Sequence, residues 1–176
     1  FTLVAFDQIV NMAANLRYMS GGQISVPMVI RAPTGAGVQL GATHSQSFET
    51  WLAEVPGMKV VCPSTPYDAL GLMRSAIKDD NPVLMAEPAL LYGAKGEVPD
   101  EYYEIEIGKA DVTREGSDIT LVSYGYGMRP VNDAAGTLEG RGVSVEVIDL
   151  RSLAPIDMDA IVASVKKTNR VVVVDN

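Results

Sequence analysis

The stretch GATHSQSFETWL, residues 41–52, contains His44, the single histidine of this 176-residue chain. It follows a glycine-rich run, TGAG at residues 34–37, and its immediate neighbours are small polar residues. Imidazole changes its charge near neutral pH, so a histidine in such a loop is suited to transferring a proton or binding a ligand. A surface histidine that makes no more than a hydrogen bond is the alternative that the residues alone leave open.

A second candidate site lies at Asp79 and Asp80, which follow a stretch with helical periodicity. The last carbonyl groups of a helix have no partner within the helix, and carbonyl oxygens together with a carboxylate can bind a hard cation. The residues therefore suggest a cation site at this helix end. A turn exposed to solvent is the alternative interpretation.

Two further features have weaker chemical implications. Cys62 ends an apolar run with no base nearby in the sequence, which favours a buried structural thiol over a nucleophile. Gly125 and Gly127 follow an expected strand, as the first two glycines of a G-x-G-x-x-G dinucleotide-binding loop would. Pro130 occupies the position of the last glycine, so the pattern is incomplete and a nucleotide site is not favoured.

The first half of the chain has to position His44 and Asp79. Helical periodicity and capping residues predict helices over residues 4–16, 48–55 and 64–80. Ser64 or Thr65 is the expected N-cap of the third helix, and Pro66 suits its first turn. Apolar runs bounded by turn residues predict buried strands at residues 26–33, 58–63 and 81–88.

The second half repeats this alternation after residues 93–108, which are acidic, rich in turn residues and therefore expected to be a linker. Apolar, β-branched runs predict strands at residues 117–125, 143–150 and 170–175. Helical patterns predict helices at residues 128–142 and 156–169. Alternating strands and helices in both halves predict an α/β fold with parallel sheets flanked by helices.

The composition excludes several classes of partner. The formal net charge is −8 and the pI is about 4.6, so the chain lacks the clustered positive charge that nucleic-acid binding requires. No apolar run approaches the roughly 18 residues of a membrane span. A single cysteine allows neither an internal disulfide nor a cysteine-based zinc site, which suits a reducing cytoplasm.

Both ends of the sequence suggest a fragment of a longer protein. The chain begins at Phe1 without an initiator methionine, and it ends in RVVVVDN, an expected strand without a following turn.

Taken together, these stretches resemble the β subunit of thiamine-diphosphate-dependent 2-oxo acid dehydrogenases, the first component of the pyruvate, branched-chain and acetoin dehydrogenase complexes. The resemblance rests on FDQIVNMAANLRYMSGGQ, HSQSFETWLAEVPGMKVVCPSTPYDALGLMRSAI, NPVLMAEPALLYG and VIDLRSLAPIDMDAIVASVKKTNRVVVVD. It implies the C-terminal part of a transketolase-like pyrimidine-binding domain at residues 1–92 and a linker at 93–110. The N-terminal part of a transketolase C-terminal α/β domain is implied at residues 111–176.

The resemblance also implies site residues. His44 in the H-S-Q motif matches the active-site histidine of the family, placed at the mouth of the thiamine site at the α/β subunit boundary. Phe1 matches an aromatic position that contacts the aminopyrimidine ring of the cofactor. A potassium site built mainly from backbone carbonyls is implied at Met28, Ala76, Ile77, Asp79 and Asn81.

The implied function is oxidative decarboxylation of pyruvate and transfer of the acyl unit to lipoyl groups. The implied cofactors are thiamine diphosphate, with magnesium held mainly by the α subunit, and potassium. The implied partners are the α subunit, in a heterotetramer of two α and two β chains, the dihydrolipoyl acyltransferase core and a 2-oxo acid substrate. A bacterial cytoplasm is the expected location, or a mitochondrial matrix or plastid in a eukaryote. The glutamate of the family that contacts the aminopyrimidine would lie upstream of Phe1. The resemblance therefore implies that this chain by itself is inactive.

Several alternatives stay open at this point. EPALLYG and VKKTNR favour pyruvate as substrate, whereas VVCPSTPYDALGL and GEVPDEYY are shared with acetoin dehydrogenases, and a branched-chain substrate is a further possibility. A transketolase or deoxyxylulose phosphate synthase fragment fits the H-S-Q context and the linker poorly. A non-catalytic module for subunit assembly is the alternative from a different class.

Overall fold

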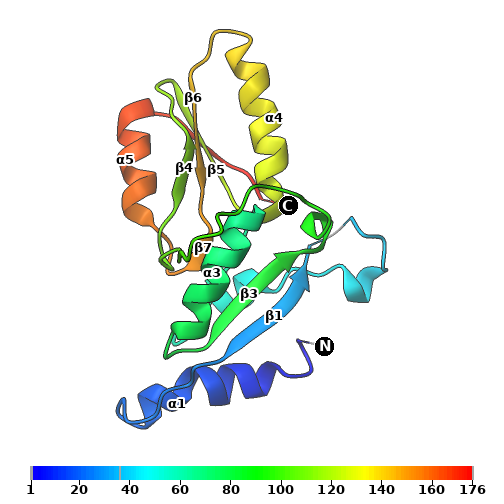
Figure 1. Ribbon diagram of the computed structural model, residues 1–176, viewed down its shortest axis with the longest axis vertical. Coiled ribbons are helices and arrows are strands. Elements are labelled where there is room, and N and C mark those ends of the chain that lie inside the picture. The colour runs from blue at the N-terminus through cyan, green and yellow to red at the C-terminus, as the bar shows by residue number, and fades with distance from the viewer. Residues whose placement is uncertain (1, 36, 176) are drawn as a thin grey trace.

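The structure, a computed structural model, describes residues 2–35 and 37–175. It contains two four-stranded sheets, one in each half of the chain, with helices on both faces of each sheet (Figure 1). The strand orders are β1-β3-β2-β7 and β4-β6-β5-β8. The predicted α/β class with mostly parallel sheets is therefore confirmed.

The first sheet has a parallel core. β1 (Val29–Thr34) and β2 (Lys59–Val61) both run parallel to the central strand β3 (Val83–Pro88). One face packs on α3 (Pro66–Lys78), and the other packs on η1 (Gln8–Ala13), α1 (Ala14–Met19) and α2 (Glu49–Ala53). Successive strand residues point to opposite faces, so Val60 and Leu84 join the core on the α1 and α2 side, and Val61 and Met85 join the core under α3.

The helix starts follow the sequence signals. The Thr65 hydroxyl accepts a hydrogen bond from the Asp68 backbone N–H at 3.1 Å, so Thr65 is the N-cap of α3, with Pro66 as its first residue. The expected first helix is present, but its first part, η1, has π-helical hydrogen bonding. The Asn15 side chain donates to the Val10 carbonyl at 2.9 Å, where this wider stretch passes into α1.

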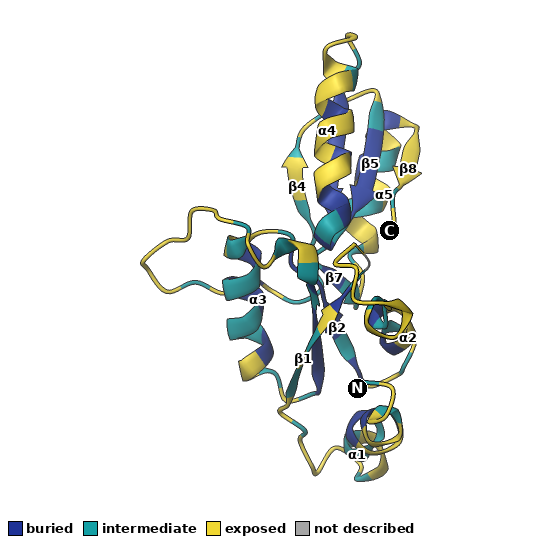
Figure 2. Cartoon of the chain, turned by 90° about the vertical axis from the view of Figure 1, so that its right-hand side faces the viewer, coloured by how far each residue is buried: buried dark blue, intermediate teal, exposed yellow. Residues whose placement is uncertain are grey.

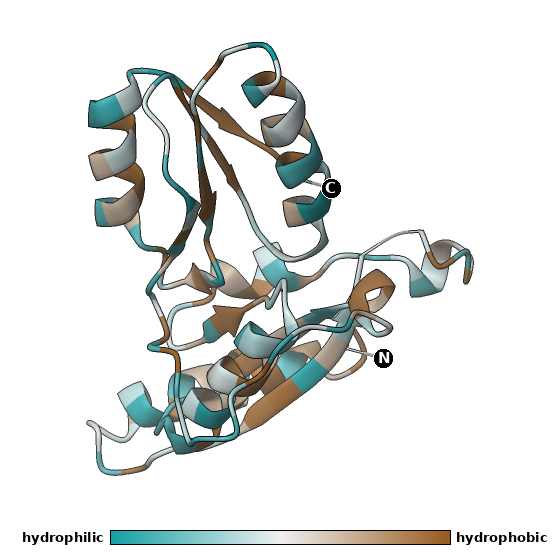
Figure 3. Cartoon of the chain, turned by 45° about the horizontal axis from the view of Figure 1, so that its top comes forward, coloured by the Kyte–Doolittle hydropathy of each residue, from teal (hydrophilic) through white to brown (hydrophobic). Residues whose placement is uncertain are grey.

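The second sheet is built from β5 (Ile119–Ser123), β6 (Val145–Asp149) and β8 (Val171–Val173), which are parallel. α4 (Met128–Glu139) follows the short turn η4 (Gly125–Gly127) and covers one face, and α5 (Met158–Thr168) covers the other. Figure 3 shows apolar strands between helices whose outer sides are polar, and Figure 2 shows the same contrast as burial. The core of this half therefore lies along both faces of β5 and β6.

Two short strands were missed by the sequence interpretation, and both pair antiparallel. β4 (Asp111–Arg114) pairs with β6 at the edge of the second sheet. β7 (Ser152–Ala154) leaves the second half of the chain and pairs with β2 of the first sheet. A strand of three or four residues is too short to show a clear period, and its partner is distant in sequence. The predicted division at residues 93–110 stays a prediction, and β7 joins the two halves.

The expected linker is partly packed rather than free. Ile105 is buried against α3, and its backbone N–H donates to the Gly71 carbonyl at 3.2 Å. A Cβ atom at Gly71 would lie 2.6 Å from Ile105, so glycine is needed for this close approach. Tyr103 also packs along α3, where its ring stacks on Tyr67 with the centroids 4.5 Å apart.

Candidate active site

His44 lies on the loop that connects β1 to α2, at the end of the parallel strands where the chain leaves the sheet (Figure 1, cyan segment beside the tip of β1). It ends the short 3-10 turn η2 (Ala42–His44), and its backbone N–H donates to the Gly41 carbonyl at 3.1 Å. The Ser45 hydroxyl donates to the same carbonyl at 2.9 Å. His44 is exposed and lies near the carboxyl ends of the parallel strands, where α/β folds bind their ligands.

The side chain faces a cavity of about 590 Å³. Apolar walls come from Val38, Leu40 and Phe48, and polar groups come from Thr34 and Gln46. The remaining described lining residues are Thr2, Arg31, Ala32, Pro33, Gly35, Thr43 and Ala89. An apolar cavity with a few polar groups suits a flat aromatic ring that carries hydrogen-bonding substituents.

The charges of this cavity do not suit a free anion. Arg31, the one lysine or arginine among its described lining residues, is held by Glu87 through Nε–Oε1 and Nη2–Oε2 contacts of 2.5 and 3.1 Å. Tyr92 donates to the same carboxylate at 3.0 Å. A paired guanidinium has little attraction left for a second anion. The described residues that line this cavity therefore fit the ring portion of thiamine diphosphate and supply no unpaired lysine or arginine for its diphosphate.

The loop that carries His44 is fixed at its base by two buried polar side chains. Thr34 is the last residue of β1, Glu49 is the first residue of α2, and the Thr34 hydroxyl donates to the Glu49 carboxylate. Beside them, the Phe48 ring meets the Trp51 ring edge to face with centroids 5.9 Å apart. The sequence interpretation missed Glu49, because nothing in the sequence around it indicates that its carboxylate meets Thr34.

The structure brings some of the residues of the predicted cation site close together. The end of α3 meets the segment before β1, where the Val26 N–H donates to the Asp80 carbonyl at 2.8 Å. The carbonyl of Met28 accepts from the Val83 N–H at 2.9 Å, and that of Ala76 accepts from the Asp79 N–H at 3.3 Å. These two carbonyls therefore already have partners, and the Ile77 side chain is exposed.

The acidic member of this set is also engaged. The Asp79 carboxylate forms an ion pair with Lys59 and accepts hydrogen bonds from the Asn81 backbone and side-chain amides at 2.9 and 2.8 Å. Burial alone raises the pKa of Asp79, but these donors outweigh it and hold the pKa below its ordinary value. Within the described residues no cluster of three histidine, cysteine, aspartate or glutamate side chains is arranged to hold a metal ion. A potassium ion would have to share Asp79 with Lys59.

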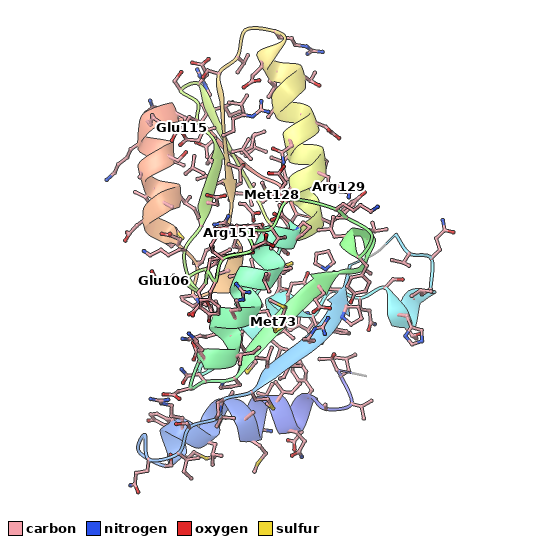
Figure 4. The ribbon with its side chains drawn as sticks, in the orientation of Figure 1. Met73, Glu106, Glu115, Met128, Arg129 and Arg151 are labelled. Atoms are coloured by element: carbon pink, nitrogen blue, oxygen red, sulfur yellow. The ribbon has the colours of Figure 1, made fainter. Side chains whose placement is uncertain are left out.

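A second polar cluster lies at the junction of the two sheets. Arg151 contacts Asp68 of α3 at 2.7 Å and Asp111 of β4 at 2.8 Å, and Figure 4 shows Arg151 between the two halves. The Ser64 hydroxyl donates to Asp149, the last residue of β6. Asp149 is 1% exposed, and this burial raises its pKa to about 7. Beyond the N-cap, no sequence signal pointed to this cluster, because its members come from three separate elements and two connecting segments.

The glycines after β5 have a packing explanation. Gly125 has a φ of +52°, and a Cβ atom there would lie 2.7 Å from the Cys62 sulfur. A Cβ atom at Gly127 would lie 2.3 Å from the Ser123 hydroxyl. The expectation of a buried structural thiol is confirmed, because Cys62 is 1% exposed and burial raises its pKa well above the ordinary value. Phe1, the expected aminopyrimidine contact, lies outside the described residues.

None of the described helices is long and apolar enough to cross a membrane. Residues 1–95 match the pyrimidine-binding domain of transketolase, and residues 108–176 match the transketolase C-terminal domain. A split-gene transketolase, described as an inactive β4 tetramer, has a similar structure with a TM-score of 0.78 and 27% identity, over 97% of this chain and 52% of that one. Fold and site thus define a pair of transketolase-type domains, the first of them a thiamine-diphosphate-binding pyrimidine domain.

The curated relatives narrow this class. The β subunit of the acetoin:2,6-dichlorophenolindophenol oxidoreductase of Cupriavidus necator is 49% identical over 99% of this chain and 52% of its own length. The β subunit of the pyruvate dehydrogenase E1 component of Porphyra purpurea is 49% identical over 99% of this chain and 53% of its own length. The chain belongs to this family of thiamine-diphosphate-dependent dehydrogenase β subunits, and it spans about half the length of these relatives.

Proposed function

We propose that this chain forms part of a β subunit that completes a thiamine diphosphate site together with an α subunit. The proposal rests on one observation: His44 is exposed and lines a mainly apolar cavity. This cavity lies near the carboxyl ends of the parallel strands, where α/β folds bind their ligands. When bound, thiamine diphosphate supplies the carbanion chemistry that protein side chains cannot provide. The cavity holds its ring, and the α subunit supplies the charges for its diphosphate and magnesium.

In this proposal His44 handles a proton during acyl transfer. Transfer of an acyl unit to a lipoyl group opens the S–S bond and leaves a sulfur that has to be protonated. An imidazole at the mouth of the cavity can deliver that proton and take one back. Its exposure leaves room for a lipoyl group to approach from solvent, carried by an acyltransferase core.

We propose pyruvate as the first candidate substrate and acetoin as the second. Relatives named for each activity are 49% identical to the chain, so overall similarity does not separate the two. EPALLYG and VKKTNR favour pyruvate. The further parts of the proposal are an assembly of two α and two β chains, a potassium ion at the end of α3, and the domain division at residues 93–110.

Replacement of His44 tests the proposal in an α/β enzyme that contains this chain. We expect His44→Ala to lower acetylation of a lipoyl domain by about 10²- to 10⁴-fold, the range of general acid–base catalysis. Reduction of 2,6-dichlorophenolindophenol, which needs no lipoyl sulfur, should fall much less. Assays with pyruvate and with acetoin as donor identify the substrate.

The control is Thr50→Ala, an exposed position on α2 outside the cavity, which should behave as wild type. Equal losses of thermal stability and of activity in His44→Ala would contradict the catalytic role. Unchanged lipoyl acetylation in His44→Ala would likewise contradict that role. A non-catalytic assembly module would be favoured if adding this chain left the affinity of the α subunit for thiamine diphosphate unchanged.

A further inference from the structure

The loop between Thr34 and Glu49 is long and rich in glycine, and it begins where the pairing of β1 with β3 ends. Thr34 pairs in register with Pro88, and Pro33 pairs with Glu87. The Val83 N–H donates to the Met28 carbonyl, so in this register both prolines lie at positions that face away from the β1–β3 ladder, and neither removes a donor from it. The strand pairing ends at Thr34, so beyond this residue a side-chain contact is needed to hold the two ends of the loop together.

The Thr34–Glu49 hydrogen bond provides that contact. Thr34 is 7% exposed and Glu49 is 5% exposed, and the bond joins the residues on either side of the loop. A buried hydroxyl or carboxylate left without its partner is costly, so the bond should persist as long as both side chains stay buried. Near its start, the loop passes close to Leu90: a Cβ atom at Gly37 would lie 2.8 Å from the Leu90 side chain.

The same carboxylate also reaches the junction of the sheets. Glu49 lines a small cavity of about 10 Å³, roughly the volume that admits one water molecule, together with Cys62, Tyr124 and Tyr126. Tyr124 follows β5 of the second sheet, and its hydroxyl donates to Asp175 at 2.8 Å. Glu49 is thus enclosed by groups from both halves of the chain, and its position depends on their packing.

We propose that Glu49 is a positioning residue for His44, acting through Thr34 to hold the two ends of the His44 loop together. Glu49 does not line the cavity that His44 faces, whereas Thr34 does, so the carboxylate acts from behind the cavity wall. The inference rests on the proposed function, because it assigns a role relative to a catalytic His44. An error of about 1 Å in the position of a catalytic group can lower a rate by roughly 100-fold.

The test compares variants of the pair in the α/β enzyme. Glu49→Ala and Thr34→Val should each lower the kcat for lipoyl acetylation by about 10- to 100-fold, with the KM for the donor and the affinity for thiamine diphosphate changed less than about threefold. Thr34→Ser and Glu49→Gln keep a donor and an acceptor, and they should retain most of the activity. Glu54→Gln, an exposed glutamate at the end of the same helix, is the matched control.

A double variant separates positioning through His44 from an independent effect. If Glu49 acts through His44, the variant His44→Ala with Glu49→Ala should be no slower than His44→Ala alone. A further loss of tenfold or more in the double variant would overturn the proposal. A rise in KM with unchanged kcat in Glu49→Ala would also overturn it.

Limited proteolysis supplies a readout that does not depend on activity. The loop contains Leu40 and Phe48, and chymotrypsin should cut there at least tenfold faster in Glu49→Ala and Thr34→Val than in wild type or Glu54→Gln. Unchanged cleavage would refute the role of the bond, even if activity fell. Faster cleavage together with an activity that does not respond to His44→Ala would refute the catalytic role of His44 and leave the loop contact standing. Should Glu49→Ala fail to fold, Thr34→Val and Thr34→Ser give the same comparison.

Discussion

Asp149 should make the stability of this protein depend on pH near neutrality, and Asp149→Asn should remove that dependence. Asp149 is 1% exposed, and the groups around it come from several elements. Ser64 donates to its carboxylate, as does the backbone N–H of Arg151 at 3.1 Å, and Asp68 lies close enough to repel it. Burial is the largest effect on its pKa, followed by the Ser64 bond, which opposes it.

The size of the effect follows from the shift in pKa. The pKa rises from the ordinary 3.8 to about 7, a shift of about 3 units. Each unit corresponds to about 1.4 kcal/mol, so the shift amounts to roughly 4 kcal/mol. The folded chain keeps a proton that the unfolded chain has already released. The stabilisation is therefore complete below pH 3.8 and is lost as the pH rises through 7, with roughly 2 kcal/mol of that loss between pH 5.5 and 7.5.

Denaturant unfolding at several pH values measures this loss. The wild-type free energy of unfolding should fall between pH 5.5 and 7.5, and the curve of Asp149→Asn, which cannot ionise, should be flatter by roughly 2 kcal/mol over this range. Asp133→Asn, an exposed position on α4, is the control and should follow the wild-type slope. Parallel curves for wild type and Asp149→Asn would refute the reasoning, because another group would then carry the titration.

Two further predictions concern a glycine and the cation site. Gly57 has a φ of +92°, and a Cβ atom there would lie 2.1 Å from the Ala14 carbonyl oxygen, so Gly57→Ala should lower the thermal midpoint. Gly136 on α4 has open space around its Cα, so Gly136→Ala should instead stabilise the protein by up to about 1 kcal/mol. Equal changes in the thermal midpoint of the two variants would contradict the close contact at Gly57. Lys59→Met should free Asp79 for a cation, so potassium should raise its thermal midpoint more than that of wild type, with choline at equal ionic strength as the control. No response to potassium in either protein would refute the cation site.

The sequence by itself determined the elements whose signals are local. Thr65 and Pro66 fixed the start of α3, because capping depends on residues within one turn. The apolar, β-branched runs predicted β1, β2, β3, β5, β6 and β8 in order, because a buried strand has to be apolar along its length. The glycine-rich stretch before His44 predicted a loop, and the structure has one there. The family followed from the order of such motifs along the whole chain.

The tertiary structure decided what depends on residues distant in sequence. β7 is a strand because it pairs with β2, and a segment of three residues is too short to show a period that would predict this pairing. Ile105 is buried because Gly71 lets it approach α3, although its surroundings in sequence are acidic. Asp149 and Glu49 are ordinary acidic residues in the sequence. Only folding buries them, next to Ser64 and Thr34 respectively. Desolvation and hydrogen bonding are properties of the assembled site, so no local pattern could have predicted them.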